Sequence, residues 1–143
     1  MQKEKIVVVG NGPVAHKFLE TLLASGQADR FQITVFGEES RPAYDRVHLT
    51  KWFETRDPES IAMASSAFYS DNGMTCHTGE KITDIDRAAK TVTSESGLNE
   101  SYDHLILATG SYPFVPPVPG HDRDNTFVYR TLDDLEEMTA AAE

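Results

Sequence analysis

The pattern Gly-x-Gly-x-x-Ala near the N-terminus, formed by Gly10, Gly12 and Ala15, has a spacing suited to binding phosphate. It follows an apolar run over residues 6–9 and precedes an amphipathic segment. The first glycine allows a tight turn, the second lets the backbone approach a pyrophosphate, and the small third residue lets a helix pack on the strand. Amides at the helix start, together with the helix dipole, would attract the phosphate charges. The residues expected to contact a dinucleotide are Gly10, Asn11, Gly12, Pro13, Val14 and Ala15.

A dinucleotide site of this kind also needs a carboxylate for the adenosine ribose, at the end of the second strand. Glu38 and Glu39 stand at that point, after an expected strand over residues 31–36. Either carboxylate could accept bonds from both ribose hydroxyls, and the alternative is a pair of solvated loop acids. A carboxylate here disfavours a 2′-phosphate, so the site suits FAD or NAD better than NADP.

The elements that must position these residues form a β-α-β unit over residues 5–37. A helix is predicted after the glycine loop because apolar residues recur there at helical spacing and Ser25-Gly26 supplies a stop. Its expected apolar face consists of Val14, Ala15, Phe18, Leu19, Leu22 and Leu23.

The remaining pattern predicts shorter elements and then a change of architecture. We expect short helices over residues 49–53 and 66–72, a strand over 74–77, an antiparallel meander over about 80–103, a closing strand over 104–108 and a terminal helix over 131–142. The parallel sheet should have the order 74–77, 33–36, 6–9, 104–108. The fold class is therefore α/β, a Rossmann-like three-layer domain spanning residues 1–143.

Composition excludes several classes of protein. The net charge of −10 disfavours nucleic acid or an anionic membrane as a partner, because phosphate binding needs clustered Lys and Arg. No apolar run approaches the roughly 20 residues that span a bilayer, and no signal peptide precedes the first strand, so a cytoplasmic protein is expected. The single cysteine, Cys76, rules out an internal disulfide, and the five histidines lack metal-ligand spacing, so no metal site is expected.

Two further segments resemble the FAD-dependent pyridine-nucleotide oxidoreductases. Residues 41–51 read Arg-Pro-Ala-Tyr-Asp-Arg-Val-His-Leu-Thr-Lys, and residues 102–113 read Tyr-Asp-His-Leu-Ile-Leu-Ala-Thr-Gly-Ser-Tyr-Pro. In that family both segments and the glycine loop belong to one flavin domain. The resemblance implies that Arg46 reaches the FAD phosphates and that Lys51 lies near flavin N5, closest to the chemistry. It also implies that the backbone of Ala108, Thr109 and Gly110 passes close to the cofactor.

A narrower resemblance is to the N-terminal flavin domain of the large subunits of NAD(P)H-dependent assimilatory nitrite reductases. It is carried by Tyr-Asp-Arg-Val-His-Leu at 44–49, Gly-Ser-Tyr-Pro-Phe-Val-Pro-Pro at 110–117 and Phe-Val-Tyr-Arg-Thr at 127–131. Electrons from NAD(P)H would pass through FAD and iron–sulfur centres to sirohaem, where nitrite is reduced to ammonia. Ferredoxin or rubredoxin reductases are the alternative within the family. An adenine-nucleotide module, or an acidic docking surface with a vestigial loop, are the non-enzymatic alternatives.

The same resemblance predicts that the domain is incomplete. In the family, an NAD domain and a later Gly-Asp segment complete the flavin site, and the sequence contains neither of them nor a cysteine cluster for iron–sulfur or sirohaem. We therefore expect a truncated domain, inactive alone, whose partners are FAD, the remainder of the enzyme and a small subunit. NAD(P)H, the iron–sulfur cluster and sirohaem would belong to the full-length enzyme. The strand over 104–108 would have one unpaired edge, which predicts that the chain either self-associates through that edge or is only marginally stable as a monomer.

Overall fold

The computed structural model describes residues 2–143, which form two compact units. The first unit runs to Tyr44 and resumes over Ala62–Gly110, and the second comprises Asp45–Ile61 and Ser111–Glu143. The first contains β1 (Glu4–Val9), α1 (Pro13–Ala24), η1 (Ala28–Arg30), β2 (Phe31–Phe36), α3 (Ser66–Asp71), β3 (Thr75–His77), β4 (Ile82–Asp86), β5 (Thr91–Ser94), β6 (Asn99–Ser101) and β7 (His104–Leu107). The second contains η2 (Arg46–Lys51), α2 (Trp52–Thr55), η3 (Pro58–Ile61) and α4 (Leu132–Ala142). None of the helices within residues 2–143 has the length and apolar character needed to cross a bilayer.

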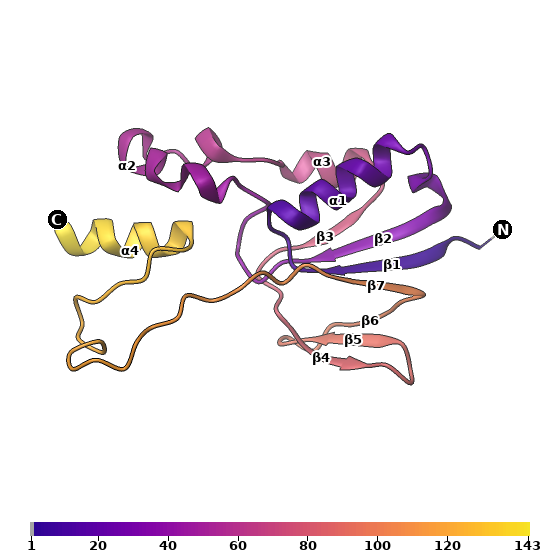
Figure 1. Ribbon diagram of the computed structural model, residues 1–143. Helices are drawn as coiled ribbons and strands as arrows, with labels where there is room; N and C mark the ends of the chain where they lie inside the picture. Colours follow the sequence, from indigo (N-terminus) through magenta and orange to yellow (C-terminus); the bar gives the residue numbers. More distant parts are fainter. Residues whose placement is uncertain (1) are drawn as a thin grey trace. The chain divides into compact units, whose positions relative to one another are not determined.

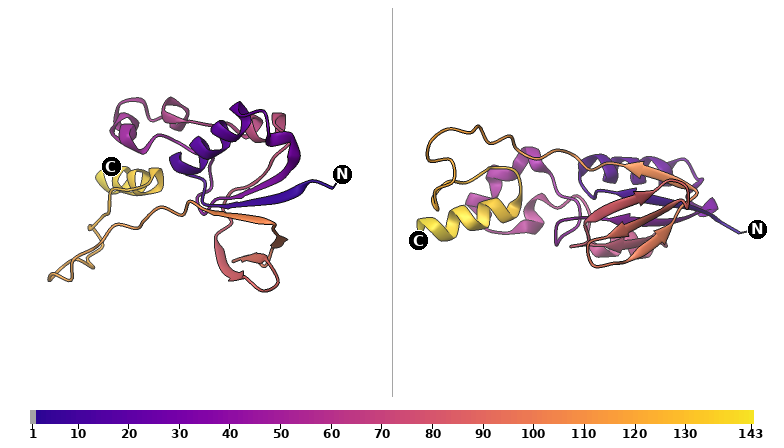
Figure 2. Two further views of the ribbon diagram at one scale, coloured as in Figure 1. Left: turned by 45° about the vertical axis from the view of Figure 1, so that its right-hand side comes forward. Right: turned by 90° about the horizontal axis from the view of Figure 1, so that it is seen from below.

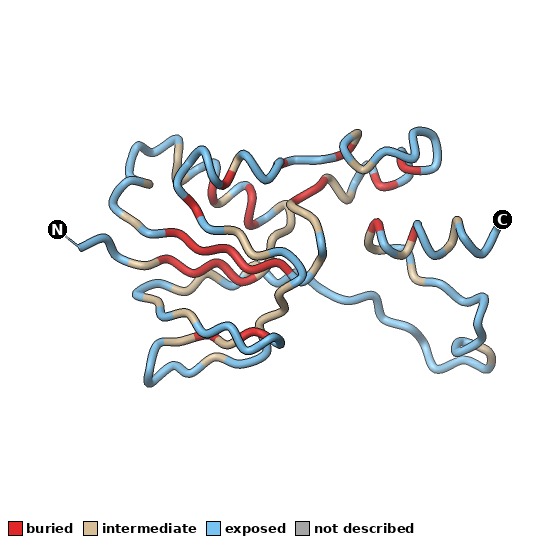
Figure 3. Tube along the Cα trace, turned by 180° about the vertical axis from the view of Figure 1, so that it is seen from behind, coloured by how far each residue is buried: buried red, intermediate tan, exposed pale blue. Residues whose placement is uncertain are grey.

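The first unit is built on a four-stranded parallel sheet with the order β3-β2-β1-β7, which confirms the predicted order (Figure 1). Strand β1 is central: Ile6 is the register partner of Ile33 in β2 and of His104 in β7. Three consecutive β-branched residues follow Ile6, as is typical of a strand that is buried on both faces. Figure 3 shows the continuous buried stretches along β1 and β2.

Two layers cover the parallel sheet, as Figures 1 and 2 show. On one face Ile6 and Val8 join α1, α3 and β2 in a core that includes Leu19 and Tyr69. On the other face Val7 and Val9 pack with Phe36 and with Val92 of the antiparallel β4-β5-β6 sheet. Alternate residues of β1 thus serve opposite layers, as the two-residue period of a strand requires. The α/β three-layer fold is confirmed.

One part of the predicted helix face was wrong. Val14 is 72% exposed, whereas His16 is buried next to Ala15 and Leu19. Successive helical residues are about 100° apart, so the two neighbours of Ala15 point to different sides of the helix. The buried face of α1 includes His16, which lies about one turn before Leu19. Val14 lies outside this face, at the end of the helix next to the glycine loop. The apolar side chain is therefore outside the core and the polar one inside it.

The second unit is organised by side-chain caps. Asp45 opens η2 by accepting a hydrogen bond from the Val47 amide at 2.8 Å. Thr131 caps α4: its hydroxyl accepts a bond from the Asp134 amide, and the Asp134 carboxylate accepts one from the Thr131 amide. This reciprocal pair is a capping box. The short helix expected over residues 49–53 corresponds to the end of η2 and the first half of α2.

Candidate functional site

The glycine loop begins where β1 ends and is fixed there by its neighbours. The Gly10 amide donates to the Phe36 carbonyl at the end of β2, at 2.8 Å. Gly10 has φ +101°, and a Cβ on it would lie 2.1 Å from the carbonyl oxygen of Ala108 and 3.0 Å from the Cα of Thr109. Two segments that the sequence assigned to one site therefore meet: the glycine loop and the backbone after β7. This contact admits no side chain at Gly10.

Gly12 occupies a different environment from Gly10. It is the N-cap of α1, with φ −105°, and no side chain caps the helix there. A Cβ on Gly12 would meet no heavy atom within 4 Å, so the fold itself does not demand glycine. The first intrahelical bond runs from the His16 amide to the Gly12 carbonyl at 3.0 Å, which leaves the Val14 and Ala15 amides without intrahelical acceptors. The open helix start is suited to an anionic ligand that approaches closely.

Asn11, between the two glycines, turns its side chain into the fold. Its Oδ1 accepts a hydrogen bond from the Tyr69 hydroxyl at 2.8 Å, and its Nδ2 donates to the Cys76 sulfur at 3.5 Å. Burial raises the pKa of Tyr69 and raises that of Cys76 to about 11, so both groups are protonated at neutral pH. The Asn11 side chain thus has a role within the fold. Sequence analysis missed the Tyr69 contact, because the pattern showed only an aromatic residue at a packing position.

The two candidate ribose acids differ in their surroundings. Glu38 is exposed and forms an ion pair with Lys81 at 3.1 Å. Glu39 is half-buried, and its Oε2 accepts a hydrogen bond from the buried Tyr44 hydroxyl at 2.5 Å. A carboxylate held in this way is better ordered than an exposed one, because burial and a hydrogen bond restrict its rotamers. Glu39 is therefore the acid with the more fixed geometry.

Arg46 and Lys51 both lie on η2 in the second unit. The Arg46 guanidinium donates to the Arg130 carbonyl at 3.1 Å, and the exposed Lys51 ammonium donates to the Ser60 carbonyl at 3.4 Å. Beside them the His48 ring contacts the Asp45 carboxylate at 2.6 Å, and this hydrogen bond lowers the pKa of Asp45. The segment thus presents two cations and an oriented imidazole on one short helix.

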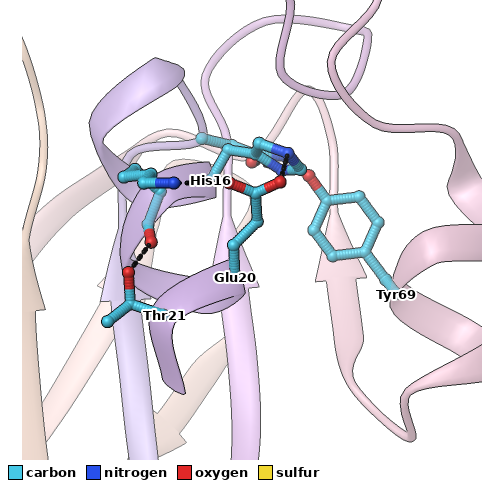
Figure 4. A network of polar contacts seen from close by, with 6 residues as sticks. His16, Glu20, Thr21 and Tyr69 are labelled. Atoms are coloured by element: carbon cyan, nitrogen blue, oxygen red, sulfur yellow. Dashed lines mark hydrogen bonds and ion pairs between the residues drawn. The ribbon is translucent and has the colours of Figure 1, made fainter. Parts of the chain in front are cut away.

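A polar network on α1 lies next to the core (Figure 4). The buried His16 contacts Glu20 through Nε2 at 3.4 Å, and Lys17 contacts the same carboxylate at 3.3 Å. The His16 ring also packs on Phe68, with centroids 5.0 Å apart. Figure 4 shows the Tyr69 side chain extending from α3 toward this helix. Sequence analysis gave His16 no role. Within residues 2–143, no group of three or more His, Cys, Asp and Glu side chains could hold a metal ion.

Comparison with known proteins identifies the family of the chain. The chain belongs to the pyridine nucleotide-disulphide oxidoreductase family, whose sequence pattern matches residues 4–143. This confirms the family inferred from the motifs. The two segments and the loop that carried the resemblance all lie within the matched region.

Two relatives are large subunits of nitrite reductases. The chain is 46% identical over 142 residues to the nitrite reductase [NAD(P)H] large subunit of Klebsiella oxytoca, covering 99% of this chain and 15% of the relative. It is 43% identical to the nitrite reductase (NADH) large subunit of Escherichia coli, covering 99% and 17%. The chain therefore spans less than a fifth of the length of each of these two relatives.

A solved structure shares the fold. The complex of putidaredoxin reductase with putidaredoxin superposes with a TM-score of 0.85 at 25% identity, covering 99% of this chain and 34% of that one. The parallel sheet with its two covering layers is therefore the arrangement found in a known reductase.

Proposed function

We propose that this chain is the FAD-binding portion of an NAD(P)H-dependent nitrite reductase. Its similarity to two nitrite reductase large subunits along nearly its whole length supports the enzyme class. The observation that carries the binding assignment is Gly12, where the helix start is uncapped and a Cβ would meet no atom of the protein. A glycine that the fold does not need, at the start of a helix after a buried strand, is explained by a ligand that approaches the backbone there.

The residues of the first unit fit the adenosine and pyrophosphate parts of FAD. The loop Gly10, Asn11, Gly12, Pro13, Val14 and Ala15 would surround the pyrophosphate. The Val14 and Ala15 amides, which have no intrahelical acceptor, would donate to it, and the helix dipole would favour its charge. Glu39, ordered by Tyr44, would accept bonds from the ribose hydroxyls in preference to Glu38. The backbone of Ala108, Thr109 and Gly110 would pass close to the cofactor, since it already contacts Gly10.

The two cations lie in the second unit, and their roles are those that the family resemblance implies. Arg46 would bind the FAD phosphates, as a guanidinium pairs well with phosphate oxygens. Lys51 would lie near flavin N5, where its ammonium would favour negative charge on the ring. When bound, FAD supplies the capacity to accept hydride from NAD(P)H and to pass electrons on. NAD(P)H, the iron–sulfur cluster, sirohaem and the nitrite site are assigned to other parts of the larger enzyme, with a small subunit as a further partner.

A redoxin reductase is the second candidate function. The similarity to putidaredoxin reductase, at 25% identity, favours electron transfer to a small iron–sulfur protein. The two functions share the flavin site and differ only in the electron acceptor. Electron transfer from NAD(P)H to nitrite, measured with the larger protein that contains this chain, therefore distinguishes the two functions. Reduction of nitrite supports the nitrite reductase.

The flavin assignment is tested by titrating the purified chain with FAD and recording visible absorption and calorimetry. Gly12→Val should weaken binding by a few kcal/mol, roughly the loss of several charge-assisted hydrogen bonds. Thermal unfolding should change little, because the new side chain meets open space. Equal affinity for FAD in the wild type and in Gly12→Val would contradict the proposed site, and binding of AMP without FAD would favour an adenine-nucleotide module.

A further inference from the structure

Tyr69 is a buried phenol whose hydroxyl is aimed at the glycine loop. Its side chain is 1% exposed in the core shared by α1, α3 and the parallel sheet. A buried phenol needs a partner for its O–H, since an unpaired one retains its desolvation cost. The partner is Asn11 Oδ1 at 2.8 Å, a contact between residues far apart in the sequence. The contact joins α3 to the middle residue of the loop.

Asn11 is held from two further directions. Its Nδ2 donates to the sulfur of Cys76 on β3 at 3.5 Å, and burial keeps that sulfur protonated by raising its pKa. A Cβ on Gly37, at the end of β2, would lie 2.9 Å from the Asn11 Cβ, so the side chain fits only because residue 37 is glycine. The Gly37 amide is itself bound to the His77 carbonyl at 2.8 Å. Elements α3, β2 and β3 thus all limit where Asn11 lies.

The loop has a particular need for such a restraint. The residues on either side of Asn11 are glycines, which lose the most backbone freedom when a loop becomes ordered. No side chain caps α1, so capping does not fix the loop from the helix side. A loop that is ordered before a ligand arrives saves the cost of ordering it during binding. The contacts of Asn11 with Tyr69, Cys76 and Gly37 can order the loop before the ligand binds.

We propose that Tyr69, acting through Asn11, is a positioning residue that holds the glycine loop in its pyrophosphate-binding conformation. The proposal rests on the proposed function, because it assigns the loop to a dinucleotide. Tyr69 contacts the loop from the side of the core: its hydroxyl donates to Asn11 and is also hydrogen-bonded to the Ala43 backbone, outside the loop. Its role is therefore specific to ligands that contain the pyrophosphate group.

The test is calorimetric binding of ADP and of adenosine to the chain and its variants. Tyr69→Phe removes the neutral hydrogen bond to the loop, together with the one to the Ala43 backbone, and should weaken ADP binding about three- to tenfold. Adenosine, which has no pyrophosphate, should bind equally well. A general loss of protein stability would weaken the binding of both ligands or of neither. A change in the ratio of the ADP affinity to the adenosine affinity therefore indicates a positioning role of Tyr69 and not a folding defect. Tyr102→Phe, which removes a phenol from a half-buried residue after β6, is the matched control and should change neither affinity.

A double-mutant cycle tests whether Tyr69 affects ADP binding through Asn11. Asn11→Ala should weaken ADP binding to a similar extent, and Tyr69→Phe should then cause no further loss, because both changes remove one interaction. Asn11→Ala also serves if Tyr69→Phe does not fold. Unchanged ADP affinity in either folded variant, or fully additive losses, would overturn the proposal. Failure of the wild type to bind ADP at all would instead contradict the proposed function.

Discussion

The Gly10 backbone and the Ala108 carbonyl oxygen lie so close that a Cβ on Gly10 would be 2.1 Å from that oxygen. Gly10 also has φ +101°, a conformation that residues with side chains rarely adopt. Gly10→Ala should therefore destabilise the first unit by about 3 kcal/mol or more, combining strain and displacement of β7. Denaturant unfolding followed by circular dichroism measures this loss.

Gly12→Ala is the matched control for that experiment. Its Cβ meets no heavy atom within 4 Å, and φ is −105°. The loss of stability should be below about 1 kcal/mol, reflecting only the poorer N-cap preference of alanine. Similar losses in the two variants would show that the contact with Ala108 does not determine the requirement for glycine.

Substitutions of the two acids after β2 should weaken ligand binding to different extents. Glu39→Ala should weaken binding of adenosine-containing ligands by roughly 1–3 kcal/mol, because the ribose hydroxyls lose their acceptor. Glu38→Ala should stay within about 0.5 kcal/mol, as expected for an exposed residue in a surface ion pair with Lys81. Isothermal titration with ADP compares them. Equal losses, or a larger loss for Glu38→Ala, would mean that Glu39 is not the ribose acid.

The Cys76 thiol should be unreactive at neutral pH. Burial raises its pKa from 9.0 to about 11, so little thiolate is present at pH 7. The rate of alkylation by iodoacetamide should rise only between pH 9 and 11. In the same range the free energy of unfolding should fall, because the unfolded chain ionises first and is thereby stabilised. Cys76→Ser is the control for both measurements, and rapid alkylation at pH 7 would contradict the expectation.

The capping box should dominate the stability of α4. Thr131→Ala removes the acceptor of the Asp134 amide and should cost about 1 kcal/mol. Asp134→Ala should cost at least as much, since its carboxylate accepts from the Thr131 and Arg130 amides at 2.7 and 2.8 Å. Glu137→Ala, at an exposed position in the same helix, should change little. Urea unfolding that gave the same midpoint for all three variants would contradict the assignment.

Strand β7 should mediate self-association. Among the described strands it pairs with β1 alone, and Leu107 on it is 61% exposed. An unpaired apolar edge is a template for another strand. Light scattering of the wild-type chain should show dimers or larger species, and Leu107→Lys should shift the distribution to monomer, because a charged edge resists pairing. A wild type that is monomeric at high concentration would contradict this expectation.

The fold was predictable wherever one local pattern determined it. The β-branched run at 6–9, the glycine loop and the helix stop at Ser25-Gly26 together defined the β-α-β unit, and the sheet order followed from parallel topology. The start of α4 is predictable in the same way, from a threonine followed by acidic residues in the first turn. These features need only short stretches of sequence.

The rest depends on contacts between distant residues. Sequence periodicity predicts only that Tyr69 is a packing residue. It shows which face of a helix a residue occupies but not which partner the Tyr69 hydroxyl binds. Val14 and His16 were misjudged because an apolar side chain at a helix start need not meet the sheet, and a polar one can be buried beside Phe68. Whether the assigned residues hold FAD stays a prediction that the binding experiments address.

The dependence of Gly10 on Ala108 also has a consequence for the order of folding. Strand β1 pairs with β2 after a short connection, but the Lys5–Asp103 contact next to β7 joins residues 98 apart in the sequence. Pairings over such separations form late, because the entropy of closing a long loop must be lost first. During synthesis, the N-terminal loop therefore leaves the ribosome long before the strand that completes it. The glycine loop is thus made well before β7, and it is among the last segments to reach its final conformation.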